Sequence, residues 1–252
     1  MKTEEWKNRI MRGWMKLRLQ PIRVLCFHEI GNCCAGSSDW VPTEFLQSIL
    51  MDMQKQGCTF ISLSEAHRHI ANDILRTRKY AVLTADDGLR CHMEILPWLE
   101  EHNIPITLCL NVTSPHLKQC GLPYKKWYHI KEAEMEQKYA EQLYVPDAEL
   151  DKLESPLVTY ALHGFNHNEA ATDLTLEELQ QDIQQCVNRY GKHPRYVPFY
   201  TYKYGKHNAQ TDALVRQNHL IPVLSDGRMN YNDESVIHRE IVEAIYKKWQ
   251  QK

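Results

Sequence analysis

Short apolar runs alternate along the chain with segments whose apolar residues recur at helical spacing. Seven of these runs predict buried strands, because they are brief and rich in β-branched or aromatic residues. The predicted strands are Ile22–Phe27, Thr59–Leu63, Tyr80–Thr84, Ile104–Val112, Leu157–Leu162, Arg195–Tyr200 and Ile221–Leu224. The predicted helices are Phe45–Gln56, Ser64–Ile70, Leu89–Asn103, Thr175–Gly191, Ala209–Gln217 and Ile241–Trp249.

Strands that alternate with helices at this spacing predict βαβ units and a parallel sheet. Seven such units in a chain of 252 residues favour a distorted or incomplete, seven-stranded (β/α) barrel over the second possibility, an open doubly wound sheet. No Gly-x-Gly-x-x-Gly follows the first strand, so a dinucleotide site is not indicated. We therefore expect residues 1–252 to form a single domain.

Two segments do not follow this alternation. Residues 113–156 carry a charged, helix-favouring middle and predict a partly helical insertion on one rim of the barrel. The segment Met1–Gln20 predicts an amphipathic helix that packs on the barrel, with a membrane or partner contact as the alternative. Its apolar residues at helical spacing are Trp6, Ile10, Trp14 and Leu17.

Composition limits the partners and the compartment. The 30 basic and 32 acidic residues nearly cancel, so no overall field favours nucleic acid or an anionic membrane. No apolar run reaches the about 18 residues of a transmembrane helix, and Met1–Gln20 has no apolar stretch long enough for a signal peptide. Eight cysteines without a Cys-x-x-Cys pair fit reduced thiols. We therefore expect a cytoplasmic protein.

Polar residues follow three of the predicted strands, where the active site of a (β/α) barrel lies. They are His28, the pair Asp86-Asp87, and His163 with His167. The last two have a structural alternative: Asp-Gly is a common turn, and two histidines four apart occur by chance in a chain with 13. The combination is more specific, because two imidazoles and one carboxylate match a catalytic zinc site. The second carboxylate can then serve as general base.

The residues around these positions resemble the motifs of a known family. Thr84-Ala-Asp-Asp-Gly88 resembles the Thr-Phe-Asp-Asp-Gly motif of the polysaccharide deacetylases (NodB-like, carbohydrate esterase family 4), and His163-Gly-Phe-Asn-His167 resembles their His-(Ser/Thr)-x-x-His motif. Val24-Leu-Cys-Phe-His-Glu-Ile30 is similar to an early strand of the family, and Tyr202-Lys-Tyr-Gly-Lys-His-Asn208 to its third motif. The similarity covers roughly residues 22 to 240.

The resemblance implies a role for each matching residue. Asp86 matches the catalytic base, and Asp87, His163 and His167 match the metal triad. Tyr204 matches the third-motif aromatic, whose backbone helps to bind the oxyanion, and we place Tyr202 and His28 with it as substrate- or oxyanion-contacting residues. The implied cofactor is a divalent metal, with zinc first and iron, cobalt, manganese or nickel as alternatives.

The chain also departs from the family pattern. The first-motif phenylalanine is Ala85, the third-motif proline is Lys203, and the usual arginine would fall near Thr201. Arg195 lies nearby in sequence, but the sequence does not place it against Asp86. The late strand with the acid histidine has only Val236-Ile-His-Arg239 as a remnant, which makes His238 the candidate acid. Arg239 could equally form a salt bridge to a carboxylate.

A dense aromatic run allows two interpretations: rings on which sugars stack, or rings that fill the core and rim. Its members are Tyr196, Phe199, Tyr200, Tyr202 and Tyr204.

Three hypotheses for function follow. The first is a metal-dependent hydrolase that removes N-acetyl groups from an amino sugar of a poly- or oligosaccharide or its precursor, with hydrolysis of another non-peptide C–N bond as a variant. A cytoplasmic location favours a precursor over a finished wall polymer. The second is a barrel that binds metal and saccharide without turnover, and the third is a barrel whose two motifs are accidental turns.

Overall fold

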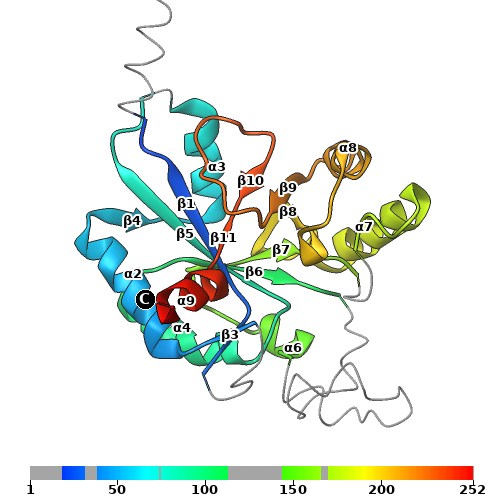
Figure 1. Ribbon diagram of the computed structural model, residues 1–252. Helices are drawn as coiled ribbons and strands as arrows, with labels where there is room; N and C mark the ends of the chain where they lie inside the picture. Colours follow the sequence, from blue (N-terminus) through cyan, green and yellow to red (C-terminus); the bar gives the residue numbers. More distant parts are fainter. Residues whose placement is uncertain (1–18, 32–38, 74, 113–143, 166–169, 252) are drawn as a thin grey trace, which may run out of the picture.

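The computed structural model describes residues 19–31, 39–73, 75–112, 144–165 and 170–251. All seven predicted strand regions contain strands, and they alternate with helices along the chain (Figure 1). The main strands are β1 (Ile22–Phe27), β4 (Cys58–Phe60), β5 (Lys79–Asp86), β6 (Ile106–Leu110), β7 (Val158–Leu162), β8 (Tyr196–Thr201), β9 (Ile221–Leu224), β10 (Ile237–His238) and β11 (Glu240–Ile241). The helices are α2 (Thr43–Lys55), α3 (Leu63–Asn72), α4 (Cys91–Glu101), α6 (Asp147–Leu150), α7 (Leu176–Tyr190), α8 (Ala209–Gln217) and α9 (Val242–Gln250).

The nine main strands form one parallel sheet. Its order is β10-β9-β8-β7-β6-β5-β1-β11, with β4 paired to the beginning of β5. The two ends of this order belong to one chain segment, Ile237–Ile241, because β10 pairs with β9 and β11 pairs with β1. The sheet therefore curls into a nearly closed (β/α) barrel rather than an open doubly wound sheet.

Asn230 completes the barrel between β1 and β10. Its backbone N–H and C=O exchange hydrogen bonds with Ile22, and its side chain bonds the C=O of Ile22 and the N–H and C=O of His238. The Asn230 side chain therefore bonds backbone groups of Ile22 and His238 that do not pair directly with each other.

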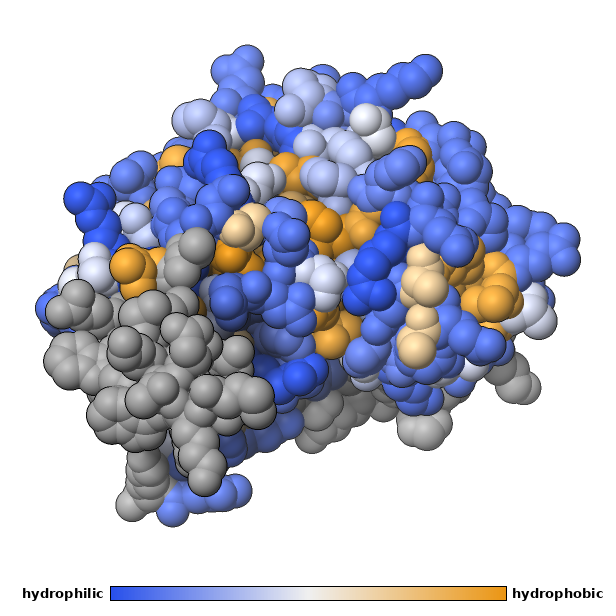
Figure 2. All heavy atoms as spheres, turned by 90° about the horizontal axis from the view of Figure 1, so that it is seen from above, coloured by the Kyte–Doolittle hydropathy of each residue, from blue (hydrophilic) through white to orange (hydrophobic). Residues whose placement is uncertain are grey.

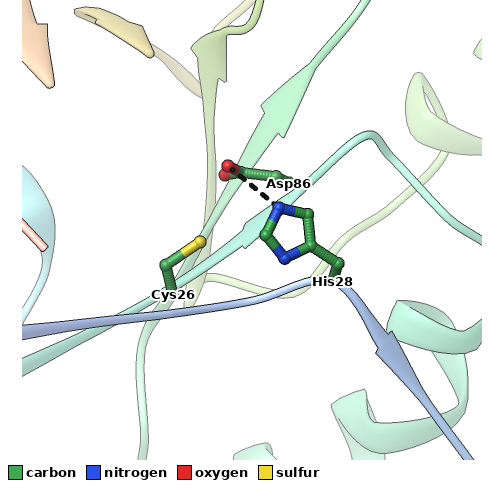
Figure 3. A group of neighbouring side chains, drawn as sticks. All are labelled: Cys26, His28 and Asp86. Carbon is green, nitrogen blue, oxygen red and sulfur yellow. Dashed lines mark ion pairs between the residues drawn. The ribbon is translucent and has the colours of Figure 1, made fainter. Parts of the chain in front are cut away.

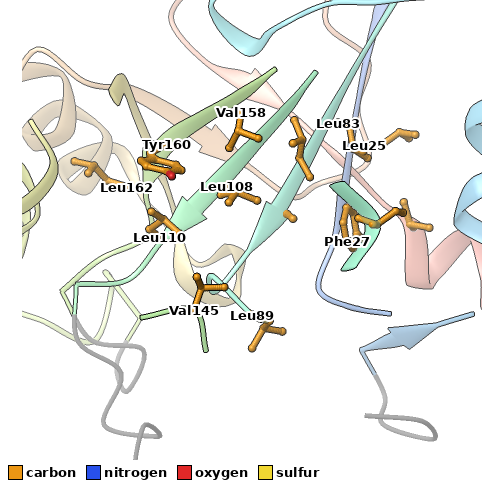
Figure 4. Packing of buried hydrophobic residues seen from close by; sticks show 14 of the residues in the cluster. Leu25, Phe27, Leu83, Leu89, Leu108, Leu110, Val145, Val158, Tyr160 and Leu162 are labelled. Carbon is orange, nitrogen blue, oxygen red and sulfur yellow. The ribbon is translucent and has the colours of Figure 1, made fainter. Parts of the chain in front are cut away.

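Side chains alternate between the two faces of each strand, as strand geometry requires. One set packs between the strands and the surrounding helices, as Figure 4 shows for Leu25, Leu83, Leu108 and Tyr160 among others. The other set points into the barrel and forms a smaller apolar cluster. That inner cluster includes Val24, Val82, Cys109, Ala161, Phe199, Val223 and Ile237.

Two helix starts are fixed by caps. The helix α3 begins before the predicted Ser64, because the Ser62 hydroxyl accepts the N–H of Glu65 and makes Ser62 the N-cap. The helix α7 begins with a capping box formed by Thr175 and Glu178, and Leu176 beside it is 46% exposed. The buried face of α7 is formed by Leu179, Asp182, Ile183, Cys186 and Tyr190.

Some predictions lie outside the described residues. The helix within Met1–Gln20 is one, and most of the insertion at 113–156 is another. The end of that insertion is described and contains α6 and a β-bridge between Tyr144 and Leu89. No helix of the described residues is both long and apolar enough to cross a membrane. Hydrophilic residues make up most of the face seen in Figure 2, with smaller apolar areas between them.

Candidate active site

The residues that could carry chemistry lie at the carboxyl ends of the barrel strands. Counting in steps of two from the inner apolar cluster places His28 on the inner face of β1, Asp86 on that of β5 and His163 just beyond β7. The same count places Arg239 on the inner face between β10 and β11. It places His238 on the outer face.

Asp86 and Arg239 form a buried, two-pronged ion pair. The Arg239 guanidinium donates from Nη1 to Asp86 Oδ1 at 2.7 Å and from Nη2 to Oδ2 at 2.8 Å. Neither side chain is more than 3% exposed. Burial alone would raise the pKa of Asp86, but the charges of Arg239 and the adjacent histidines hold it well below its usual range. Asp86 is therefore an ionised carboxylate in a fixed orientation.

Arg239 also contacts Thr84 and Ser225, whose hydroxyls lie at 3.1 and 2.7 Å from its two terminal nitrogens. Arg195, the other arginine considered for this role, instead donates to the backbone carbonyls of Leu153, Ser155 and Val158. The arginine that faces Asp86 is thus supplied by the segment between β10 and β11 and not by Arg195.

Asp87 and His163 meet at the opening of the barrel. His163 Nε2 lies 3.3 Å from Asp87 Oδ1 and 3.9 Å from Asp86 Oδ2. Its other ring nitrogen, Nδ1, lies 3.0 Å from the carbonyl oxygen of Thr201 and therefore carries the hydrogen of that bond. In the neutral ring this places the hydrogen on Nδ1, and Nε2 is then the nitrogen that can bind a metal. His167 lies outside the described residues.

The backbone at Asp87 adopts a left-handed conformation, with φ of 76°. Such a conformation is unusual for a residue with a side chain and tends to occur at functional sites. Gly88 follows with φ of 68°, so the chain turns sharply at the end of β5. This turn aims adjacent aspartates differently: Asp86 points to Arg239, and Asp87 to His163.

His28 links Asp86 to a second buried carboxylate. Its Nε2 lies 3.7 Å from Asp86 Oδ2 and its Nδ1 lies 3.2 Å from Glu243 Oε1. The same Glu243 oxygen accepts the backbone N–H of His28 at 2.6 Å. Burial lowers the pKa of His28, but Glu243, Asp86 and Asp87 outweigh it and raise the pKa to about 10. The ring is therefore protonated and held by Glu243, while about a quarter of the side chain stays exposed.

The tyrosine-rich segment separates into core and surface residues. Phe199, Tyr200 and Tyr202 are at most 2% exposed, and the Tyr202 hydroxyl donates to Asp212. Tyr204 is 52% exposed and has a left-handed backbone with φ of 57°. Most of the aromatic run thus fills the core, and Tyr204 is the member that presents its ring to solvent.

His238 belongs to a different pair. It lies on the outer face of β10, and its Nδ1 is 2.9 Å from Asp226 Oδ2. The structure therefore brings His28, Asp86, Asp87 and His163 together and places His238 in a separate contact.

Asp87 and His163 fit a divalent metal ion. Zinc ligands at about 2.0–2.2 Å in tetrahedral geometry lie roughly 3.3–3.5 Å apart, which matches the separation of these two atoms. The backbone bond at His163 Nδ1 is the usual second contact of a metal-binding imidazole. The two residues can thus hold the metal together with the predicted ligand His167.

A second group with metal-binding side chains comprises Cys26, His28 and Asp86 (Figure 3). It is a poorer metal site for two reasons. Both Asp86 oxygens are already bonded to the cationic Arg239, and burial raises the pKa of the Cys26 thiol well above its usual value. A thiol must lose its proton to bind a metal.

Two contributors to the site were not predicted as such. Arg239 was named only for an unspecified salt bridge, and Glu243 was not singled out. Arg239 lies two residues after Ile237 and therefore shares the inner face with it, but this follows only once the segment is known to be a strand. No comparable local signal marks Glu243, whose contact to His28 joins residues 215 positions apart.

Comparisons with known proteins agree with the barrel fold. Residues 74–222, more than half of the chain, match the polysaccharide deacetylase family. No curated protein sequence matches. Solved structures with the same fold include IcaB from Ammonifex degensii, at 18% identity and a TM-score of 0.68, covering 92% of this chain and 98% of that one. The Streptococcus pyogenes deacetylase PplD in complex with acetate has 15% identity and a TM-score of 0.67, covering 88% and 92%. The deacetylase domain of BpsB from Bordetella bronchiseptica has 18% identity and a TM-score of 0.62, covering 87% and 95%.

At these identities the solved structures show the fold, whereas the family match includes both Asp86-Asp87 and His163. The chain therefore belongs to the polysaccharide deacetylase family.

Proposed function

We propose that the protein hydrolyses the N-acetyl group of an amino sugar in a poly- or oligosaccharide or its precursor, giving a free amine and acetate. The observation that supports this best is the 3.3 Å approach of His163 Nε2 to Asp87 Oδ1 beside the ionised Asp86. These two atoms can bind a metal, and they lie beside a carboxylate at the carboxyl ends of the strands.

Asp86 is the residue that accepts a proton from the attacking water. Its pairing with Arg239 fixes the carboxylate but makes it a weak base, because the pKa lies well below the usual range. Asp87, His163 and His167 would hold a divalent metal, which when bound would lower the pKa of water and polarise the acyl oxygen, so that a weak base is sufficient. The Arg239 contact therefore orients Asp86 at the expense of basicity.

His28 is better placed than His238 to donate a proton to the departing amine. It is adjacent to Asp86, oriented by Glu243 and protonated at neutral pH. A general acid must lie within reach of the leaving group, and His238 is paired with Asp226 on the outer face of β10. We therefore assign the acid role to His28 in place of His238.

Tyr204 supplies the substrate contact at the rim. Its exposed ring can cover the apolar face of a sugar, and its turn lies directly after Thr201, whose carbonyl holds His163. Tyr202 supports this turn from the core, since its ring is buried and its hydroxyl is committed to Asp212.

The test combines metal content with acetate release. Wild type and the variants Asp87→Ala, His163→Ala and Cys26→Ala are purified without an affinity metal, incubated with zinc, desalted and analysed by plasma mass spectrometry. We expect about one metal per chain in wild type and Cys26→Ala, and loss of the metal in the other two variants. Acetate release is then measured on oligomers of N-acetylglucosamine. A wild-type protein that binds no metal and releases no acetate contradicts the proposal.

One observation favours a second candidate function. Both Asp86 oxygens are bonded to Arg239, so the carboxylate that would accept a proton is already paired. Such a protein would bind metal and N-acetylated saccharide without turnover. Saccharide binding in calorimetry, together with no acetate after prolonged incubation, would select this function over hydrolysis.

A further inference from the structure

A buried ion pair lies behind the site, between α7 and the turn η4 (Lys203–Gly205) that carries Tyr204. Lys203 Nζ lies 3.4 Å from Asp182 Oδ2, and the two side chains are 1% and 9% exposed. Neither residue belongs to the set that would contact metal or substrate. Placing a lysine and an aspartate in the interior is costly unless they have partners, so their position requires an explanation.

The Asp182 carboxylate holds two further elements. Its Oδ2 accepts the backbone N–H of Phe165 at 2.9 Å, and its Oδ1 accepts the Tyr200 hydroxyl at 3.0 Å. Phe165 is two residues after His163 in the loop that follows β7, and Tyr200 is near the end of β8. One carboxylate therefore fixes the loop of the metal-binding histidine to both α7 and β8.

The lysine packs against the same loop. Gly164 has φ of +92°, and a Cβ atom there would lie 2.7 Å from Lys203 Nζ and 2.8 Å from its Cε. Gly164 is thus required both by its backbone conformation and by the closeness of the lysine. The lysine amine therefore lies next to both the Gly164 backbone and the Asp182 carboxylate.

The turn that carries Tyr204 has the geometry in which a proline is favoured. The Gly205 N–H donates to the carbonyl of Tyr202, so Lys203 occupies the second position of a four-residue turn. Tyr202 has φ of −74° and ψ of 125°, which is the conformation that a following proline demands. The family motif has proline at this position, where its ring would fix φ. Lysine does not fix φ in this way, so the conformation of the turn depends on its other contacts.

We propose that the Asp182–Lys203 pair is a positioning element that holds the His163–Phe165 loop and the Tyr204 turn in one arrangement. Lys203 belongs to the turn, Asp182 bonds the loop, and their contact makes the order of each segment depend on the other. Metal affinity and turnover then depend on two residues that contact neither metal nor sugar. The effect on turnover rests on the proposed function, whereas the coupling of the two segments does not.

The experiment compares Lys203→Met, Asp182→Asn and the double variant with a matched control, Arg76→Met. Arg76 is also a buried cation, 2% exposed, and it donates to four backbone carbonyls at the amino-terminal end of the barrel. Removing it lowers stability without touching the loop or the turn. Any effect that the control shares with the test variants is therefore a general loss of stability.

Amide hydrogen exchange by mass spectrometry reads the coupling directly. We expect each single variant to accelerate exchange in both segments, 157–165 and 199–206, while Arg76→Met leaves both unchanged relative to the rest of the barrel. The variant Lys203→Pro separates the order of the Tyr204 turn from the order of the His163–Phe165 loop. It should retain slow exchange in 199–206, because proline fixes the turn, and still accelerate exchange in 157–165.

Zinc affinity, measured by competition with a chromophoric chelator, gives the functional readout. We expect affinity to fall roughly 10–100-fold in Lys203→Met and Asp182→Asn, as for other residues that orient metal ligands. Exchange that changes in only one segment in Lys203→Met or in Asp182→Asn, or a zinc affinity that falls equally in Arg76→Met, overturns the inference. A wild type that releases no acetate while the exchange remains coupled refutes deacetylation and leaves the positioning role intact.

Discussion

Replacing Arg239 by methionine removes the cation that faces Asp86 inside the barrel. The two side chains are 0% and 3% exposed and meet through contacts of 2.7 and 2.8 Å. Two unit charges about 4 Å apart attract by roughly 4 kcal/mol at the effective dielectric constant of protein sites. Breaking a buried pair by removing one partner costs about 3–5 kcal/mol. We therefore expect the free energy of unfolding of Arg239→Met to fall by about 3–5 kcal/mol at neutral pH, and the melting temperature by about 6–20 °C.

The loss of unfolding free energy caused by Arg239→Met should depend on pH in a definite direction. In wild type the pKa of Asp86 is lower in the folded state than in the unfolded state. Ionised Asp86 therefore adds to the free energy of unfolding at neutral pH, and this contribution is lost below about pH 4. Without Arg239, burial raises the pKa of Asp86, and protonation relieves the buried charge. The deficit of Arg239→Met should therefore be largest near about pH 8 and shrink toward about pH 5.

Urea unfolding followed by tryptophan fluorescence measures this deficit at each pH. The double variant Asp86→Asn, Arg239→Met should lose less stability than the sum of the single variants, since it leaves no unpaired charge. A deficit below about 1 kcal/mol, the value of an exposed pair, would refute the reasoning, and so would a deficit that does not change with pH.

Two further predictions concern the site. His28→Gln should lower kcat for acetate release by roughly 10²–10⁴-fold, while His238→Gln stays within a few fold of wild type; a larger loss in His238→Gln than in His28→Gln would return the acid role to His238. Gly164→Ala should raise the Kd for zinc and lower thermal stability, because alanine is strained at φ of +92° and meets Lys203 at 2.7 Å. A variant with unchanged melting temperature and zinc affinity would show that the Gly164 loop relaxes without cost.

Local sequence signals predicted most of the barrel. Ile221–Leu224 and Ala209–Gln217 have the predicted bounds, because a short apolar run and a helical period depend only on neighbouring residues. The segment Ile237–Ile241 was not predicted as a barrel strand. It is short and polar in the middle, and its strand conformation depends on pairing with β9 and β1, which lie elsewhere in the sequence. Tertiary pairing of this kind leaves no periodicity to detect.

The candidate site likewise combines contacts that the sequence predicts with contacts that depend on the fold. The approach of Asp87 to His163 could be expected, since carboxyl ends of parallel strands gather at one end of a barrel. The partner of Asp86 could not, because Arg239 is 153 positions away and Arg195 was an equally basic alternative. Sequence also could not rank His28 above His238, as the choice depends on which face each ring occupies and on the Glu243 contact.

The strand that closes the barrel, Ile237–Ile241, follows every other strand of the sheet in the sequence, and it brings Arg239 with it. During synthesis the earlier strands leave the ribosome first, and the chain cannot close the barrel until this segment is available. Until then β1 and β9 present open edges, which are templates for pairing with other chains. Contacts between such distant segments also slow folding. The nascent chain should therefore depend on chaperones most strongly just before its last strand emerges.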